Sequence, residues 1–209
     1  MLLAIRSELG AEVVPFDAST GEVGDESVAT LTPDQVTGGG TGDPSTTPQG
    51  IVVPGVDSFL LRDPAPDRGD AIGTIRIPKI GLSWTVVEGV RRTDLNKGAG
   101  HMPDTPLPSQ PGNAVISGHR TTHGQPFHNV DDLEVGDLIF WDSGIGTHVY
   151  QVREAPLVVK PTALWVTDAR DGAWLTLTTC HPKFSARERL IIFAEMVDGP
   201  NAPVIYGTT

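Results

Sequence analysis

The stretch of sequence that decides the fold reads Trp174-Leu175-Thr176-Leu177-Thr178-Thr179-Cys180, and after the loop 181–188 the chain continues as Arg189-Leu190-Ile191-Ile192-Phe193-Ala194. Leu and Thr alternate with a period of two, which is typical of a strand with one buried face. Cys180 shares the parity of Thr176 and Thr178, so its thiol is predicted to lie on the face opposite the leucines. If the two strands are neighbours, the hairpin between them brings Arg189 close to Cys180.

Short apolar runs of the same kind recur along the chain and are separated by Gly, Pro and Asp. Such runs predict an all-β domain, built as an antiparallel barrel or sandwich. Helical patterns are short, near 94–97 and 127–133. The other runs are Gly73–Pro78, Trp84–Glu88, Asn113–Ser117, Asp137–Trp141, His148–Val152 and Leu157–Val159.

The N-terminal part of the 209-residue chain has a different composition. No Lys or Arg lies between Arg6 and Arg62, whereas nine Asp and Glu residues do, and these supply most of the net charge of −11. Between positions 16 and 56, 22 of 41 residues are Gly, Pro, Ser or Thr. A segment of this composition buries too little apolar surface to offset the conformational entropy lost when it becomes ordered. We therefore predict a flexible acidic arm or linker over residues 1–68 and a folded domain over residues 69–209. An acidic binding tail is the alternative for the arm.

Composition also excludes several classes of protein. The acidic charge argues against a nucleic-acid partner, and the single cysteine rules out an internal disulfide. No apolar run of about 18 residues is present, and Arg6 interrupts the opening apolar residues too early for a signal-peptide core. We therefore expect the chain as written to be soluble.

Three reactive side chains are candidates for chemistry. Cys180, the only thiol, ends a strand at a rim that a substrate can reach, although a lone cysteine is commonly a small buried apolar residue. His119 follows the apolar run 114–116 and is placed for acid–base work. Arg189 can hold an oxyanion or a carbonyl, or it is a surface residue paired with Glu188 or Glu195.

The sequence does not predict a metal site. His119, His123 and Cys180 could bind zinc, but the sequence has no CxxC pair and no HExxH motif. A loop rich in Gly and Pro does not fix the spacing of ligands as a helix does. We predict no metal and no cofactor.

Several of these segments resemble the sortases, the cysteine transpeptidases of Gram-positive bacteria. Thr176-Leu177-Thr178-Thr179-Cys180 is similar to the family's TLxTC signature, and Arg189-Leu190-Ile191-Ile192 to its arginine followed by an apolar strand. Gly112 to His119 resembles the segment with the catalytic histidine, and Ile75 to Ile80 the first barrel strand. The segments 118–122 and 179–182 look most like class E, the housekeeping type of actinobacteria.

The resemblance implies a closed eight-stranded β-barrel with a few short helices, covering residues 70–197. It also implies that Cys180 attacks the Thr–Gly carbonyl of a sorting signal of LAxTG or LPxTG type and forms a thioester. His119 would transfer protons, Arg189 would stabilise the oxyanion, and backbone N–H groups near Thr179 would assist. The acceptor would be an amine of a cell-wall precursor or of a protein, and the enzyme would act as a monomer at the outer face of the cell membrane or the cell wall.

The chain departs from the family pattern in two respects, and other functions are open. Some sortases bind calcium through clustered acidic residues in loops, but no such ligand set can be matched in this sequence. Sortases normally carry an N-terminal membrane helix, and no such segment is readable here. A cysteine hydrolase would use the same three residues without transfer. An L,D-transpeptidase would show His two residues before Cys, which does not fit Thr178-Thr179-Cys180. A non-enzymatic cell-surface β-domain would keep Cys180 buried and unreactive.

Overall fold

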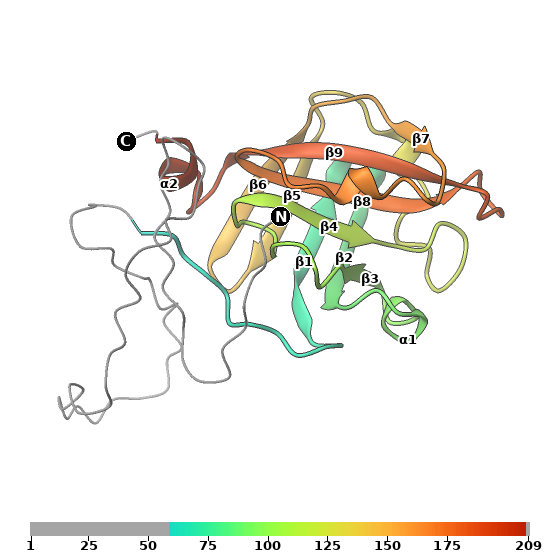
Figure 1. Cartoon of the computed structure of the whole chain (residues 1–209), viewed down its shortest axis with the longest axis horizontal. Helices are drawn as coiled ribbons and strands as arrows, with labels where there is room; N and C mark the ends of the chain where they lie inside the picture. The colour runs from blue at the N-terminus through green and yellow to red at the C-terminus, as the bar shows by residue number, and fades with distance from the viewer. Residues whose placement is uncertain (1–58, 208–209) are drawn as a thin grey trace.

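Strand pairing closes the described part of the chain, residues 59–207, into a β-barrel in the computed structural model (Figure 1). Eight strands follow one another in the order β6-β5-β1-β2-β3-β4-β8-β9, and a pairing between β6 and β9 closes the ring. β7 pairs with β9 outside this ring. The predicted closed eight-stranded barrel is therefore confirmed. The strands are β1 (Ala71–Ile77), β2 (Leu82–Glu88), β3 (Ala99–His101), β4 (Gly112–Ser117), β5 (Leu138–Ser143), β6 (Gly146–Val152), β7 (Leu157–Val159), β8 (Ala173–His181) and β9 (Glu188–Asp198).

The helices in the described residues are all short. They are the α-helices α1 (Arg92–Leu95) and α2 (Ala202–Tyr206) and the 3-10 helices η2 (Pro78–Ile80), η3 (Val130–Asp132) and η4 (Leu164–Thr167). α1 and η3 overlap the two helical patterns expected from the sequence. α2 was not predicted. Figure 1 places α2 at one end of the barrel and α1 at the other.

Each apolar run that the sequence singled out forms a strand, but the barrel also contains β3, which has no alternating pattern. This three-residue strand pairs parallel with β2 and antiparallel with β4, so it joins the two halves of the sheet. A Cβ at Gly100 would lie 2.1 Å from the carbonyl oxygen of Gly89. The backbone at Gly100 thus approaches its neighbour so closely that only glycine fits. β7, one of the predicted runs, lies outside the closed ring.

The alternation along β8 and β9 sorts their side chains between two apolar clusters. Leu175 and Leu177 belong to the large cluster that fills the barrel, together with Ile116 of β4. Ile191 and Phe193, on the opposite face of β9, pack outside the barrel in a second cluster with Val166. The predicted division of β8 into an inner and an outer face is correct, and both faces of β9 are buried along part of its length.

The segment around η4 covers part of that outer face. The side-chain amide of Asn113, on β4, donates hydrogen bonds to the carbonyl oxygens of Val166 and Asp168, at 3.1 and 3.0 Å. Its own carbonyl accepts a 2.6 Å hydrogen bond from Thr176 of β8. Because Asn113 and Thr176 are buried, these bonds satisfy polar groups that would otherwise be costly to bury. The outer face of β4 and β8 is thus closed near the start of both strands.

The segment before β1 lies against the end of the barrel that carries α2. Leu61 and Asn201 exchange two hydrogen bonds, of 2.8 and 2.9 Å, and Gln110 also donates to the Leu61 carbonyl. The rest of the predicted acidic arm, residues 1–58, lies outside the described residues. No helix within residues 59–207 is both long enough and apolar enough to cross a membrane.

His148 of β6 makes the stability of the barrel depend on pH. Its side chain is fully buried, and burial lowers its pKa from 6.5 to about 4. The unfolded chain binds a proton at His148 below about pH 6.5, whereas the folded chain does not until about pH 4, so stability is lost as the pH falls through this window. We expect a loss of about 2 to 3 kcal/mol between these limits.

Unfolding by urea, followed at pH 7 and pH 4.5, measures this dependence. Replacing His148 with Gln removes the titrating group, so the variant should lose less of its remaining stability over the same interval than the original chain. An equal pH dependence in both proteins would contradict the assignment to His148.

Candidate active site

Cys180 and Arg189 are direct partners across two antiparallel strands. In the register of β8 and β9, Cys180 faces Arg189 and Thr178 faces Ile191. Opposite residues on one face of an antiparallel pair have their Cβ atoms about 5 Å apart. The proximity expected from the hairpin is thus produced by the register itself, and both residues belong to the outer face of the barrel.

His119 reaches the same place from the other side of β8. β4 and β8 run parallel over six residue pairs, of which the last is Ser117 with Thr178. Two further bonds continue the contact past the end of β4. The Gly118 N–H donates to the Thr178 carbonyl at 3.1 Å, and the Thr179 hydroxyl donates to the Gly118 carbonyl at 2.7 Å. Extending the register by two residues places His119 beside Cys180.

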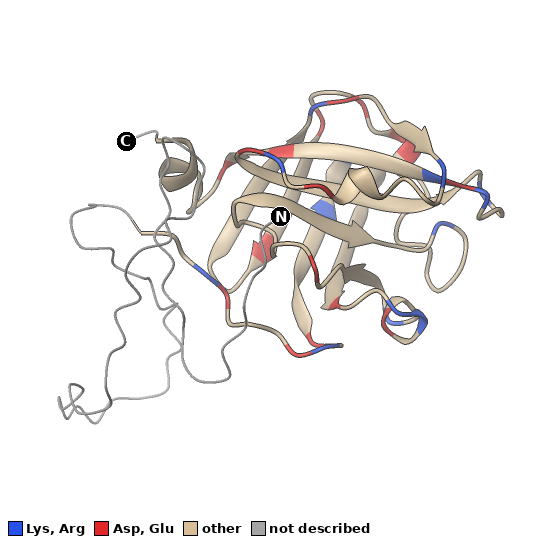
Figure 2. Ribbon diagram, viewed as in Figure 1, with Lys and Arg blue, Asp and Glu red and all other residues tan. Residues whose placement is uncertain are grey.

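The strand ends therefore gather His119, Cys180 and Arg189 on the outer face of β4, β8 and β9. All three residues are half-buried, so they are open to a substrate yet partly shielded from water. Figure 2 shows Lys and Arg near this end of the barrel, on α1 and in the connection between β8 and β9. Such charges favour the negative charge that develops on a carbonyl oxygen under attack.

The ring of His119 lies in an environment that disfavours its protonated form. Burial lowers its pKa below the usual 6.5, and the nearby His123 ring and Arg92 guanidinium lower it further. The Nε2 atom is buried and has no hydrogen-bond partner in the described residues. The imidazole is therefore neutral at neutral pH and can take up a proton.

Arg189 is held by backbone carbonyl groups and not by an acidic side chain. Its Nη1 donates to the carbonyl oxygens of Ala186 and Glu188, at 3.0 and 2.9 Å. Glu195, considered from sequence as its partner, pairs instead with Arg153. Within residues 59–207, the guanidinium makes no ion pair, and its Nε and Nη2 make no hydrogen bond, so these donors remain for a ligand.

Arg120 is a residue of this site that the sequence analysis did not assign. Its side chain is almost fully buried and pairs with Asp131 at 2.7 Å. It also donates to the carbonyl oxygens of His128 and Cys180, at 2.9 and 3.4 Å. One guanidinium thus joins the loop that carries His119 to the end of the strand that carries Cys180. Its position directly after His119 was the available signal, but only the structure reveals its burial.

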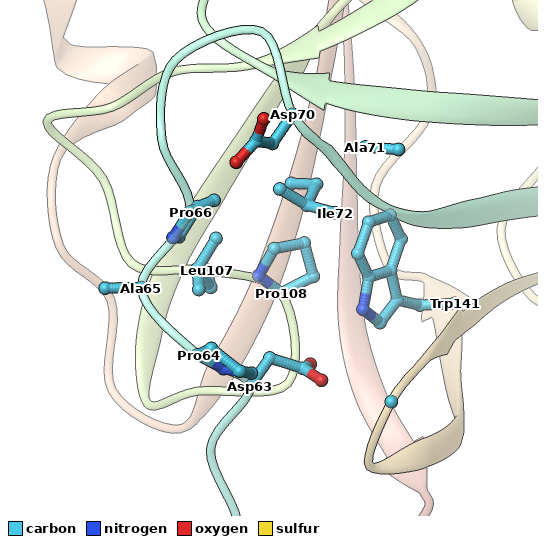
Figure 3. A pocket seen from close by; sticks show the side chains of 11 residues that line it. Asp63, Pro64, Ala65, Pro66, Asp70, Ala71, Ile72, Leu107, Pro108 and Trp141 are labelled. Atoms are coloured by element: carbon cyan, nitrogen blue, oxygen red, sulfur yellow. The ribbon is translucent and has the colours of Figure 1, made fainter. Parts of the chain in front are cut away.

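Two of the surface hollows within residues 59–207 are lined by residues other than His119, Cys180 and Arg189. The larger, of about 290 Å³, lies at the α2 end of the barrel, between Asp63, Asp70 and Trp141 (Figure 3). The smaller, of about 200 Å³, borders Trp84 and His128 beside the loop after β4. No group of three or more His, Cys, Asp or Glu side chains within residues 59–207 is arranged to hold a metal ion.

Comparisons with known proteins agree with this geometry. The family model of the sortase domain matches residues 75–197. Sortase D of Bacillus subtilis is 33% identical over 142 residues, which are 68% of this chain and 65% of that protein. The structure of sortase E from Streptomyces avermitilis superposes with a TM-score of 0.60 at 32% identity, covering 64% of this chain and 91% of that one. The structure of a sortase C from Clostridium perfringens, solved with a C-terminal cell wall sorting motif, superposes with a TM-score of 0.59 at 29% identity. The match covers 64% of this chain and 74% of that one.

A closed β-barrel with a cysteine, a histidine and an arginine at the ends of adjacent strands has the groups that a cysteine enzyme needs. With a family match over more than half of its length, the chain belongs to the sortase family. Sortases are cysteine transpeptidases that act on sorting-signal proteins. The chain spans slightly less than two thirds of the length of the Bacillus subtilis relative.

The contacts of the buried Arg120 guanidinium can be tested against those of a partly exposed arginine. Replacing Arg120 with Met removes its hydrogen bonds to the His128 and Cys180 carbonyl oxygens and its pair with the exposed Asp131, which keeps Lys183 at 3.9 Å. We expect a loss of about 2 kcal/mol in unfolding free energy. Replacing Arg153 with Met removes a partly exposed pair with Glu195 and should cost less than about 1 kcal/mol. Urea unfolding of both variants gives the comparison, and equal costs would show that Arg120 does not join the two segments.

Proposed function

We propose that this chain is a sortase-type cysteine transpeptidase with Cys180 as nucleophile, His119 as acid and base, and Arg189 as the oxyanion group. It cleaves a C-terminal sorting signal between Thr and Gly and transfers the acyl group to an amine. The proposed acceptor is an amine of a cell-wall precursor or of a protein. The proposed setting is the outer face of the cell membrane or the cell wall, with the enzyme acting as a monomer.

The observation that carries the proposal is the register of three adjacent strands. Cys180 faces Arg189 in the β8–β9 ladder, and the β4–β8 pairing leads directly to His119. Both pairings are backbone constraints, so the three side chains cannot be separated without opening the barrel. A nucleophile, a proton carrier and a cation at one place are the parts that acyl transfer needs.

The chemistry follows from these positions. His119, which starts neutral, takes the proton of the Cys180 thiol as the sulfur adds to the Thr carbonyl carbon, and the Arg189 donors stabilise the resulting oxyanion. Collapse of the intermediate breaks the C–N bond, the leaving amine of glycine takes a proton from His119, and a thioester remains. The incoming amine then attacks the thioester, gives its proton to His119, and releases the Cys180 thiolate.

Thr179 has a supporting role in this proposal. Its buried hydroxyl donates to the Gly118 carbonyl, so it fastens the His119 segment to the strand of the nucleophile. In this proposal, backbone N–H groups near Thr179 and Cys180 donate further hydrogen bonds to the oxyanion, as the family resemblance implies.

An exposed aromatic side chain in the connection between Cys180 and Arg189 supports a peptide substrate. The side chains of Val158, Leu164, Trp165 and Phe184 are exposed, with Leu164 at 75% and Phe184 at 86%. Val158 lies on β7, next to β9, and Phe184 lies in the connection between β8 and β9. Of these four, Phe184 is the one that the chain places between Cys180 and Arg189, where an aromatic ring can contact a bound peptide. The Clostridium perfringens relative was solved with a sorting motif, and we propose the same class of ligand here, with LAxTG preferred over LPxTG.

Substitution at the three residues tests the assignment. Cys180→Ala should abolish cleavage of a fluorogenic LAxTG peptide, since the chain has no other thiol. His119→Asn and Arg189→Gln should each lower kcat/KM by at least about 100-fold. Arg187→Gln is the matched control, because Arg187 is an exposed arginine of the same connection and should keep cleavage within about twofold. Activity retained in Cys180→Ala, or lost equally in both arginine variants, would refute the roles given.

Transfer is separated from hydrolysis by the fate of the thioester. With a LAxTG peptide and a millimolar amine, we expect an amide product, detected by mass spectrometry, and cleavage between Thr and Gly. The LPxTG peptide should be cut more slowly. If only the free acid forms at high concentrations of several amines, the chain is a hydrolase. If neither peptide is cut and Cys180 resists a maleimide in the folded protein, a non-enzymatic surface domain is the correct description.

A further inference from the structure

His123 lies against the proposed catalytic histidine. The two imidazole rings stack, with centroids 4.7 Å apart and an angle of 29° between their planes. Both belong to the connection between β4 and β5, and His123 is exposed whereas His119 is half-buried. Such a separation and tilt are those of a favourable offset aromatic pair.

The backbone of this connection is shaped to bring the second ring back onto the first. Three consecutive residues have positive φ, namely His123 at 50°, Gly124 at 77° and Gln125 at 54°. Residues other than glycine rarely adopt this conformation, and where they do the surroundings enforce it. Here the Gln125 N–H donates to the Thr122 carbonyl, and the Phe127 N–H donates to the His119 carbonyl.

The floor of the turn is Trp84 of β2. A Cβ at Gly124 would lie 2.6 Å from the indole ring, so the turn rests directly on that side chain and admits only glycine there. The position of the His123 ring is therefore fixed by hydrogen bonds on one side and by packing on the other.

Within residues 59–207, no hydrogen bond orients the His119 ring. A catalytic imidazole is commonly held by a carboxylate or carbonyl that bonds one ring nitrogen. Within the described residues, neither ring nitrogen of His119 makes such a bond, and Nε2 is buried without a partner. The stacked ring is thus the contact that can fix the plane of the His119 imidazole.

We propose that His123 is a positioning residue of the active site, whose ring holds the His119 imidazole in its plane and disfavours a second proton on the stacked pair. The inference rests on the proposed function of His119. The charged and titratable groups near His119 are His123 from its own loop, Arg92 from α1 and, by the register, Cys180 from β8. Two cations, His123 when protonated and Arg92, thus oppose the imidazolium, in accord with the lowered pKa of His119.

The direct test is the titration of His119 in the full-length chain, followed by NMR with labelled histidine and assigned with a His119→Asn variant. His123→Phe keeps an aromatic ring but removes its charge, so the pKa of His119 should rise by on the order of half a unit. Arg92→Gln should move it in the same direction. Thr122→Ala is the control, since Thr122 is an exposed neighbour in the same loop, and should leave the pKa unchanged. An unchanged pKa in His123→Phe overturns the proposal.

Kinetics tests the positioning role separately. His123→Ala removes the ring and should lower kcat by about tenfold with little change in KM. His123→Phe keeps an aromatic ring and should retain most of kcat, while the apparent pKa of the His119 limb in the pH profile of kcat should move to higher pH. Equal losses in the two variants would overturn the positioning role. The titration does not depend on catalytic turnover. If the protein cleaves no sorting peptide but the pKa of His119 still rises in His123→Phe, the electrostatic effect of His123 on His119 is supported and only the proposed function is refuted. If His123→Ala does not fold, as judged by circular dichroism, the phenylalanine variant carries both measurements.

Discussion

The parallel pairing of β4 with β8 is the constraint on which the rest of the site depends. β4 contributes the segment that leads to His119, and β8 ends in Cys180, so the two groups meet only if these strands are neighbours in this register. The pairing is continued beyond the strand by Gly118 and Thr179. A slip of one residue would turn every side chain of β4 to the other face, which would put His119 inside the barrel and Ala114 and Ile116 outside it. The apolar core of the barrel thereby enforces the geometry of the site.

The barrel serves as a scaffold whose outer face carries the chemistry. Its interior is filled by apolar side chains, and the three candidate residues lie on the other side of the same strands. Near the start of β4 and β8 that outer face is closed by η4, which Asn113 ties down. Toward the ends of the strands the cover stops and the polar groups stay half-buried. This degree of exposure suits the reaction, because a fully solvated histidine would keep its ordinary pKa and a fully buried cysteine could not meet a peptide.

The loop between β4 and β5 combines support and chemistry in a few residues. Arg120 joins its first residues to Asp131, later in the same connection, and to the end of β8, while Trp84 supports the turn at Gly124. His119 comes directly before Arg120 and His123 directly before Gly124, and their rings stack on each other. A loop held in this way keeps the His119 imidazole in one position, which suits the proton transfer that we propose for it. The unusual backbone of residues 123–125 is a local cost that these contacts offset.

The sequence by itself determined the strand content, the inner and outer faces of β8, the hairpin that joins Cys180 to Arg189, and the family. These features are local: a period of two in Leu and Thr, a loop of eight residues and short motifs in a fixed order. Only the tertiary structure decided that the barrel closes through β6 and β9, that β3 fills the gap between β2 and β4, and that Arg120 is buried and His123 stacks on His119. Such features depend on contacts between residues far apart in the chain or on a turn whose backbone angles are set by Trp84. A periodic pattern carries no information about either, because it records which face of a strand is apolar but not which strand lies beside it.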